Sequence, residues 1–161
     1  MDRAELEGPA VFPVAWMGES KSTNRADFAR EYTEKWYHQQ QIRLAFDSHA
    51  IESPKYLRPV YEIFACAVFV SLAPIQAGPG ATASLVISGQ SGGVWNFILD
   101  DATWKAADTG NVSENRIVLE ARDAWRFLTN RAYKSSRRAG VEQYGRPEIC
   151  AALLDTLAMM A

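Results

Sequence analysis

The sequence predicts an α+β protein: a partial helical bundle of two helices, then a small α+β domain with a mainly antiparallel sheet. Apolar residues recur at helical spacing up to about residue 73. The next segment, residues 73–82, is rich in proline and glycine, and beyond it apolar residues alternate with the period of a strand. We therefore expect two regions, residues 1–75 and residues 76–161.

The first region is expected to begin irregularly and then to form two helices. Pro9 and Pro13 exclude a helix within residues 1–23, where residues 11–16 favour a short extended segment. A helix over residues 24–47 would take Asn24 as its N-cap, with Arg30 and Glu34 as a polar pair. Its apolar face would consist of Phe28, Tyr32, Trp36, Ile42, Ala45 and Phe46.

A second helix is expected over residues 54–73. From residue 63 onward it is apolar almost all round, so it should be buried on more than one side. Either the rest of the chain or a second copy must cover it. We predict a homodimer in which this helix pairs with its copy across a two-fold axis.

The second region is expected to contain short strands and two helices. Strands are predicted over residues 83–88, 94–99, 103–107, 116–120 and 140–144. A helix is predicted over residues 121–131. Another is predicted from Pro147 to the end of the chain, because proline is favoured in a first helical turn. Residues 133–138 are polar and basic, and no helix or strand is predicted there.

The composition excludes several classes of protein. Of the 161 residues, 48% are hydrophobic and 22% are charged, which is typical of a folded soluble domain. A net charge of −2 argues against general electrostatic binding of nucleic acid or of a membrane surface. The charged first residues do not resemble a signal peptide, and Cys66 and Cys150 suit buried thiols. We expect a cytoplasmic protein that binds neither nucleic acid nor membranes.

One pair of residues has the spacing of metal ligands. Glu34 and His38 are four residues apart on the first predicted helix, which places their side chains on one face, about 5 to 6 Å apart at Cβ. Such a pair fits two ligands of a zinc-class ion, but a catalytic zinc usually has three protein ligands. His49 is too far along the chain to join easily. The alternative is a simple ion pair on the helix surface.

Two further groups of residues leave both a structural and a functional interpretation open. The five tryptophans suit core packing, or an aromatic wall for an apolar ligand. The basic cluster suits a solvated loop, or a site for the carboxylates of a small acid or thiol cofactor. This cluster consists of Arg131, Lys134, Arg137 and Arg138.

The order of several segments resembles a known family. The run AREYTEKWYHQQQIR, then YLRPVYEIF, is similar to the end of the DinB-like metal-binding bundle of mycothiol-dependent maleylpyruvate isomerases. The later segments resemble the sterol-carrier-like C-terminal domain of that family in order and spacing. These segments are LVISGQSGGVWNFIL, RIVLEARDAWRFLTNR and GVEQYGRPEICAALLDTLAMMA.

The resemblance implies particular functional residues. Glu34 and His38 match two metal ligands of the family, with zinc as the expected ion and mycothiol as the expected thiol cofactor. The family's early histidine ligand has no counterpart, so the chain resembles a shortened member with an incomplete metal site. The family also uses an arginine near its C-terminus, for which Arg146 is the candidate catalytic residue here.

The sequence therefore predicts a maleylpyruvate isomerase-like protein with weak or no isomerase activity. A metal lowers the pKa of a bound thiol, so an incomplete metal site would leave the thiol inactive. The alternative is a module without catalysis that binds a small molecule or lipid, or that associates with itself.

Overall fold

We describe residues 3–11 and 22–158 of a computed structural model of the chain. The chain forms two compact units, Met1–Glu52 and Ser53–Ala161. The predicted boundary between residues 75 and 76 therefore falls inside the second unit. The predicted extended segment over residues 11–16 lies almost wholly outside the described residues.

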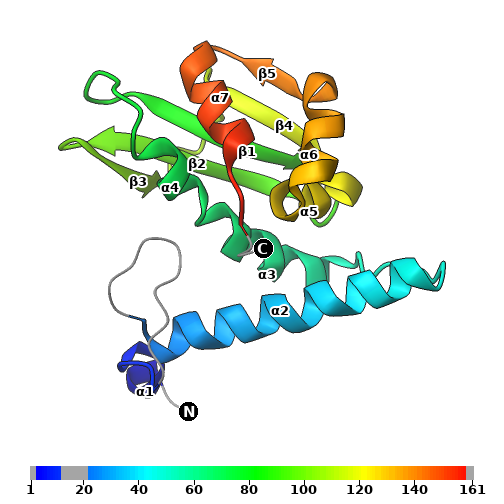
Figure 1. The fold of residues 1–161 in the computed structure, drawn as a ribbon. Coiled ribbons are helices and arrows are strands. Elements are labelled where there is room, and N and C mark those ends of the chain that lie inside the picture. The colour runs from blue at the N-terminus through cyan, green and yellow to red at the C-terminus, as the bar shows by residue number, and fades with distance from the viewer. Residues whose placement is uncertain (1–2, 12–21, 159–161) are drawn as a thin grey trace. The chain divides into compact units, whose positions relative to one another are not determined.

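The described residues of the first unit form two helices, α1 (Arg3–Glu7) and α2 (Asn24–Ala45) (Figure 1). The prediction of an irregular start was wrong at α1, a single short helix whose end is held by α2. There, the Asn24 side-chain amide donates to the Glu5 carbonyl over 2.8 Å. Thr23, and not Asn24, is the N-cap of α2, because its hydroxyl accepts from the Ala26 N–H over 3.2 Å.

The side chains buried along α2 differ from the predicted apolar face. Thr33, Trp36 and Gln40 are buried, whereas several predicted members of the face are largely exposed: Phe28, Ile42 and Phe46. The loop after α2 explains part of this burial. Ile51 accepts from the Trp36 indole N–H over 3.2 Å and donates to the Gln40 side-chain oxygen over 3.1 Å. The helix thus uses polar side chains to fasten its own C-terminal loop.

The second unit is built on a five-stranded sheet in the order β3-β2-β1-β4-β5. Its strands are β1 (Thr82–Ser88), β2 (Gly93–Asp100), β3 (Thr103–Ala107), β4 (Arg116–Glu120) and β5 (Glu142–Tyr144). All neighbours are antiparallel except β1 and β4, which run parallel. The predicted α+β class and mainly antiparallel sheet are confirmed.

Helices precede and follow these strands. The predicted helix over residues 54–73 is interrupted, forming α3 (Pro54–Ala65) and α4 (Val68–Leu72). The other helices are α5 (Ala121–Thr129), α6 (Arg131–Arg137), the 3-10 turn η1 (Arg138–Gly140) and α7 (Pro147–Asp155). No helix is predicted over residues 133–138, but α6 occupies most of this segment, with Asn130 as a side-chain N-cap.

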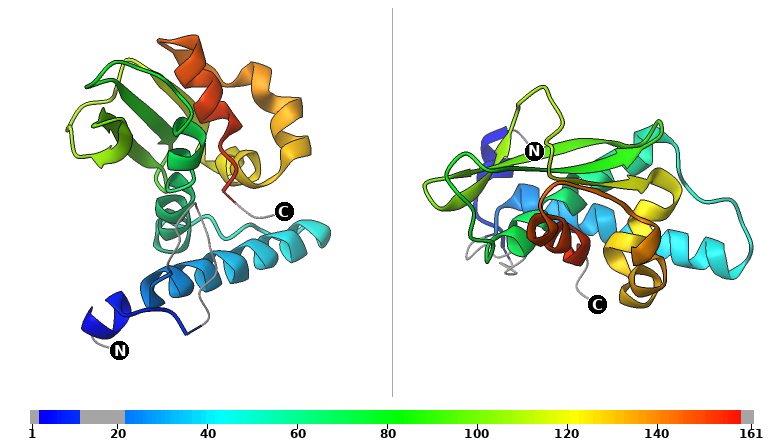
Figure 2. Two further views of the ribbon diagram at one scale, coloured as in Figure 1. Left: turned by 60° about the vertical axis from the view of Figure 1, so that its left-hand side comes forward. Right: turned by 90° about the horizontal axis from the view of Figure 1, so that it is seen from above.

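The core of this unit lies between one face of the sheet and the helices (Figure 2). Strand β1 points Leu85 and Ile87 into it, and β4 adds Ile117 and Leu119, all nearly inaccessible. The apolar stretch that predicted a dimer helix mostly packs here, since Phe64, Val68 and Leu72 are fully buried. The rest of the chain therefore buries most of this apolar stretch. Dimerisation stays a prediction.

Among the described residues, no helix is both long enough and apolar enough to cross a membrane.

Candidate functional site

The predicted metal pair is brought together on α2. The His38 Nε2 atom lies 3.3 Å from the Glu34 Oε2 atom, and both side chains are at least one-third exposed. Two ligand atoms that each lie about 2.0–2.1 Å from one tetrahedral zinc would be separated from each other by roughly this Nε2–Oε2 distance. The predicted Arg30–Glu34 pair is replaced by contacts of Arg30 with Asp27 (3.8 Å) and Glu31 (3.6 Å).

A third metal ligand is missing from the described part of the chain. There, no group of three or more His, Cys, Asp or Glu side chains is placed to hold an ion. The other ring nitrogen of His38, Nδ1, lies 2.9 Å from the Gln41 side-chain oxygen, so both nitrogens already have polar neighbours. These residues do not fit a catalytic zinc, which needs three protein ligands and an open position. Metal and mycothiol binding stay predictions.

Arg146, the predicted catalytic residue, is the N-cap residue of α7. Its backbone N–H donates to the Asn115 side-chain oxygen over 2.8 Å, and its Nε donates to Glu148 over 2.8 Å. Its guanidinium and the backbone N–H of Glu148 lower the pKa of the exposed Glu148 carboxyl, with the backbone as the larger cause. Arg146 lines neither of the two pockets described below. A structural role at the start of α7 accounts for all these contacts.

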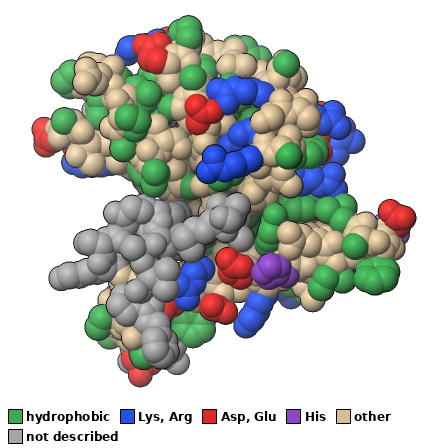
Figure 3. Space-filling view, viewed as in Figure 1, with side chains coloured by type: hydrophobic (Ala, Val, Ile, Leu, Met, Phe, Trp, Pro, Cys, Tyr) green, Lys and Arg blue, Asp and Glu red, His purple; other side chains and the backbone are tan. Residues whose placement is uncertain are grey.

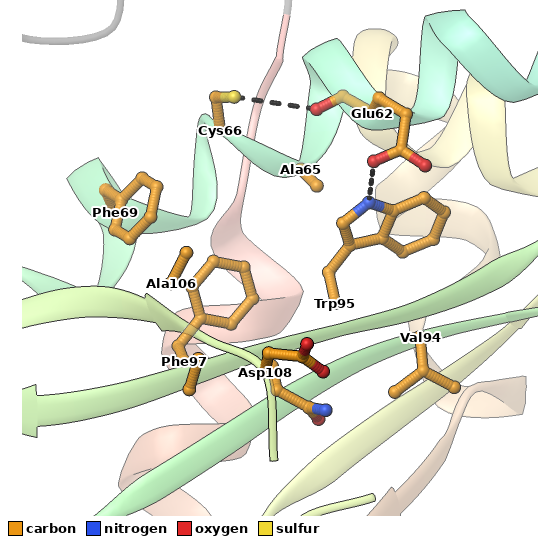
Figure 4. A pocket seen from close by; sticks show the side chains of 11 residues that line it. Glu62, Ala65, Cys66, Phe69, Val94, Trp95, Phe97, Ala106 and Asp108 are labelled. Carbon is orange, nitrogen blue, oxygen red and sulfur yellow. Dashed lines mark hydrogen bonds between the residues drawn. The ribbon is translucent and has the colours of Figure 1, made fainter. Parts of the chain in front are cut away.

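The second unit contains an apolar pocket of about 550 Å³ (Figure 4). One wall comes from α3, α4 and the turn between them, and the other from β2, β3 and the residues that follow. The walls are mainly apolar, with two carboxylates and one amide. The lining residues are Glu62, Ala65, Cys66, Phe69, Val94, Trp95, Asn96, Phe97, Ala106, Ala107 and Asp108.

The indole of Trp95 is fixed in this pocket by α3. Its N–H donates to the Glu62 carboxylate over 2.7 Å, and the second oxygen of that carboxylate accepts from Arg58 Nε over 2.7 Å. The Arg58 guanidinium lies 5.2 Å from the Trp95 ring centre and also donates to the Gly92 carbonyl. The hydrogen bond to Glu62 and the contact with the Arg58 guanidinium therefore hold the Trp95 ring against α3.

Two phenylalanines, one from each wall, meet in the same pocket. The Phe69 and Phe97 rings meet edge to face, with centres 5.2 Å apart and planes at 84°. Phe97 is 3% exposed, so it belongs to the core as well as to the pocket. Ala65 and Ala106 leave space beside these rings because their side chains are small. The pocket is therefore already open in the chain without a ligand.

The pocket revises two interpretations of the sequence. Cys150 is buried as expected, but Cys66 is only half-buried, and it lines the pocket, its thiol directed at the Glu62 carbonyl over 3.5 Å. Of the tryptophans, Trp36, Trp104 and Trp125 are buried. Trp95 instead supplies an aromatic wall, within the second unit. Trp16 lies outside the described residues.

No protein-family model, curated protein or solved structure matches the chain.

Proposed function

We propose that the Ser53–Ala161 unit binds a small, largely apolar molecule, and that the chain is a relative of mycothiol-dependent maleylpyruvate isomerases with weak or no isomerase activity. The observation that carries the binding proposal is the pocket with its walls Phe69, Trp95 and Phe97. Its volume lies within the range of about 300–1,000 Å³ that is typical of small-molecule sites.

The polar groups of the pocket favour a neutral or cationic ligand. Glu62 and Asp108 both line it, and the only cation in contact with either of them in the described structure is Arg58, on Glu62. A dianionic substrate, such as maleylpyruvate, would meet two carboxylates of its own sign. This polarity supports binding of an apolar ligand over the isomerase activity that the resemblance implies.

Binding of the neutral dye Nile red tests the proposal directly. We expect saturable binding to the wild-type chain, with an increase in dye fluorescence. Ala106→Phe should weaken this binding about tenfold or more, because the added ring occupies the space beside Phe69 and Phe97. Ala106 is exposed in the pocket, so the larger side chain should not disturb the core.

Lys105→Phe is the matched control. Lys105 precedes Ala106 on β3, but it does not line the pocket, and its exposed ammonium pairs with Asp100. The same ring is then added outside the pocket, and dye binding should stay within about twofold of wild type. Equal weakening by both variants, or dye binding that does not saturate, would refute the proposal.

A further inference from the structure

A second pocket, of about 350 Å³, lies between α6, η1 and the end of α7. It is lined by Arg131, Lys134, Ser135, Arg138, Asp155 and Leu157. Three of these side chains are cationic, and one, that of Asp155, is anionic. In the space-filling view, Lys and Arg side chains gather over this side of the second unit (Figure 3).

Lys134 is the most unusual of these residues, because a lysine on a short polar helix is seldom buried. It is only 7% exposed. Its ammonium donates to the Thr156 carbonyl at the end of α7 and lies 5.2 Å from the centre of the Phe127 ring. An ammonium has three N–H donors, and Thr156 is its only hydrogen-bond acceptor among the described residues. The remaining donors therefore call for acceptors from outside the described protein atoms.

The charges around Lys134 do not balance within the pocket. Arg138 forms an ion pair with Asp155, the carboxylate that lines the pocket, and Asp155 also interacts electrostatically with Lys134. Within the described part of the chain, the Arg131 guanidinium has no hydrogen-bond or ion-pair partner. Two positive charges, those of Arg131 and Lys134, thus lack a full countercharge in one hollow. An isolated surface lysine would simply be hydrated, but Lys134 is removed from water.

We propose that this pocket binds the oxyanion group of a small acidic ligand, a carboxylate or a phosphate. Arg131 supplies a planar pair of donors, which suits either group, and Lys134 supplies the buried ammonium behind it. Ser135 lines the same pocket from the next residue of α6, with a hydroxyl that bonds the Arg131 carbonyl over 2.9 Å. This site is separate from the apolar pocket, so the two proposals stand or fall independently.

The protonation of Lys134 gives the site a distinctive pH dependence. The pKa of Lys134 is lowered to about 8, mainly by burial; Asp155 opposes this change, and the neighbouring Arg138 and Arg131 contribute to it. A bound anion would favour the charged form and raise this pKa again. Affinity should therefore be highest below pH 8 and fall above it, as the ammonium loses its proton.

Titration of the full chain with sodium sulfate, followed by amide NMR shifts, tests this inference at constant ionic strength. Sulfate stays dianionic between about pH 7 and 9.5, so any change in affinity over that range arises in the protein. We expect saturable shifts in α6 and at the end of α7, with affinity falling about tenfold or more over this range.

Variants separate a built site from general electrostatics. Lys134→Met should abolish the pH dependence and weaken binding about tenfold, and Arg131→Gln should weaken it to a similar extent. Arg137→Gln is the matched control: Arg137 has the same charge on the same helix, is exposed and does not line the pocket. Equal weakening by Arg137→Gln, pH-independent binding, or shifts that do not saturate would each overturn the proposal.

Two further titrations distinguish the source of the oxyanion. Tighter binding of succinate than of inorganic phosphate would indicate a small carboxylic acid, and the reverse order would indicate a phosphate ester. Either order supports an oxyanion site, whereas binding of neither ion would refute it.

Discussion

The buried ammonium of Lys134 should make the stability of the chain increase with pH. Its pKa is about 8 in the folded chain against 10.5 in the unfolded chain. Between these values the unfolded state binds more protons, so the free energy of unfolding rises with pH. Below about pH 8 both states are protonated, and the cost of burying the charge is present in full.

The expected magnitude follows from the two pKa values. Between pH 7 and pH 9.5, deprotonation of Lys134 should add about 2 kcal/mol to the free energy of unfolding. Urea unfolding followed by circular dichroism at both pH values, in buffer without sulfate or phosphate, measures this gain. Other groups also titrate in this range, so the informative quantity is the difference between wild type and Lys134→Met.

Lys134→Met should lose this part of the pH dependence, while Lys105→Met should retain it. Lys105 is an exposed lysine that pairs with Asp100 over 2.7 Å, so it provides the same chemical change without burial. Identical pH dependence in wild type and Lys134→Met would show that the ammonium is solvated in the folded chain. That result would also remove the main support for the oxyanion site.

Three further predictions concern other parts of the chain. Asn115→Ala should lower the free energy of unfolding by about 2–3 kcal/mol in urea titrations, because buried Asn115 joins the Thr82 carbonyl (3.0 Å) to the Arg146 N–H (2.8 Å); a loss below the error of the measurement would contradict this role. Elemental analysis of protein purified without chelator should find far less than one zinc per chain, unchanged in His38→Ala; about one ion per chain, lost in that variant, would restore the enzyme interpretation. Analytical ultracentrifugation at micromolar concentration tests the predicted homodimer, and a monodisperse monomer would refute it.

The strands of the second unit could be predicted because local sequence determines them. Two predicted strands, residues 103–107 and 116–120, match β3 and β4 to the residue, since each lies between clear turns, and the side chains of β4 also alternate in burial. Helix α6 was missed because its sequence, RAYKSSR, has no apolar periodicity. Its anchor is instead a side-chain cap from Asn130 and the buried ammonium of Lys134, neither of which periodicity reveals.

The boundary between the units could not be read from composition. The segment rich in proline and glycine looks like a linker, yet it is hydrogen-bonded to β2 through Gly80 to Leu99 (2.9 Å) and Leu99 to Ala81 (2.8 Å). Helix α3 lies before this segment but belongs with the sheet, because Tyr61 donates to the Ala121 carbonyl and Glu62 holds Trp95. Such contacts join residues that lie 33 to 60 positions apart. Local patterns carry no information about them.

The candidate sites, too, could be predicted only where they depend on residues close together in the sequence. Spacing on one helix brought Glu34 and His38 together, as predicted, because positions i and i+4 share a face wherever the helix lies. The apolar pocket could not be predicted in this way. It needs a fixed distance between α3 and β2, which the anchors of Arg58 and Trp95 provide.

The two pockets of the second unit should select ligands of opposite character. Glu62 and Asp108 make the apolar pocket unfavourable for anions, while Arg131 and Lys134 make the other pocket unfavourable for cations and apolar molecules. An acidic metabolite and a neutral apolar one should therefore bind without competing directly. If excess sulfate displaced Nile red from the wild-type chain, the prediction that the two pockets bind without direct competition would be refuted, and charge could not be the property that separates them.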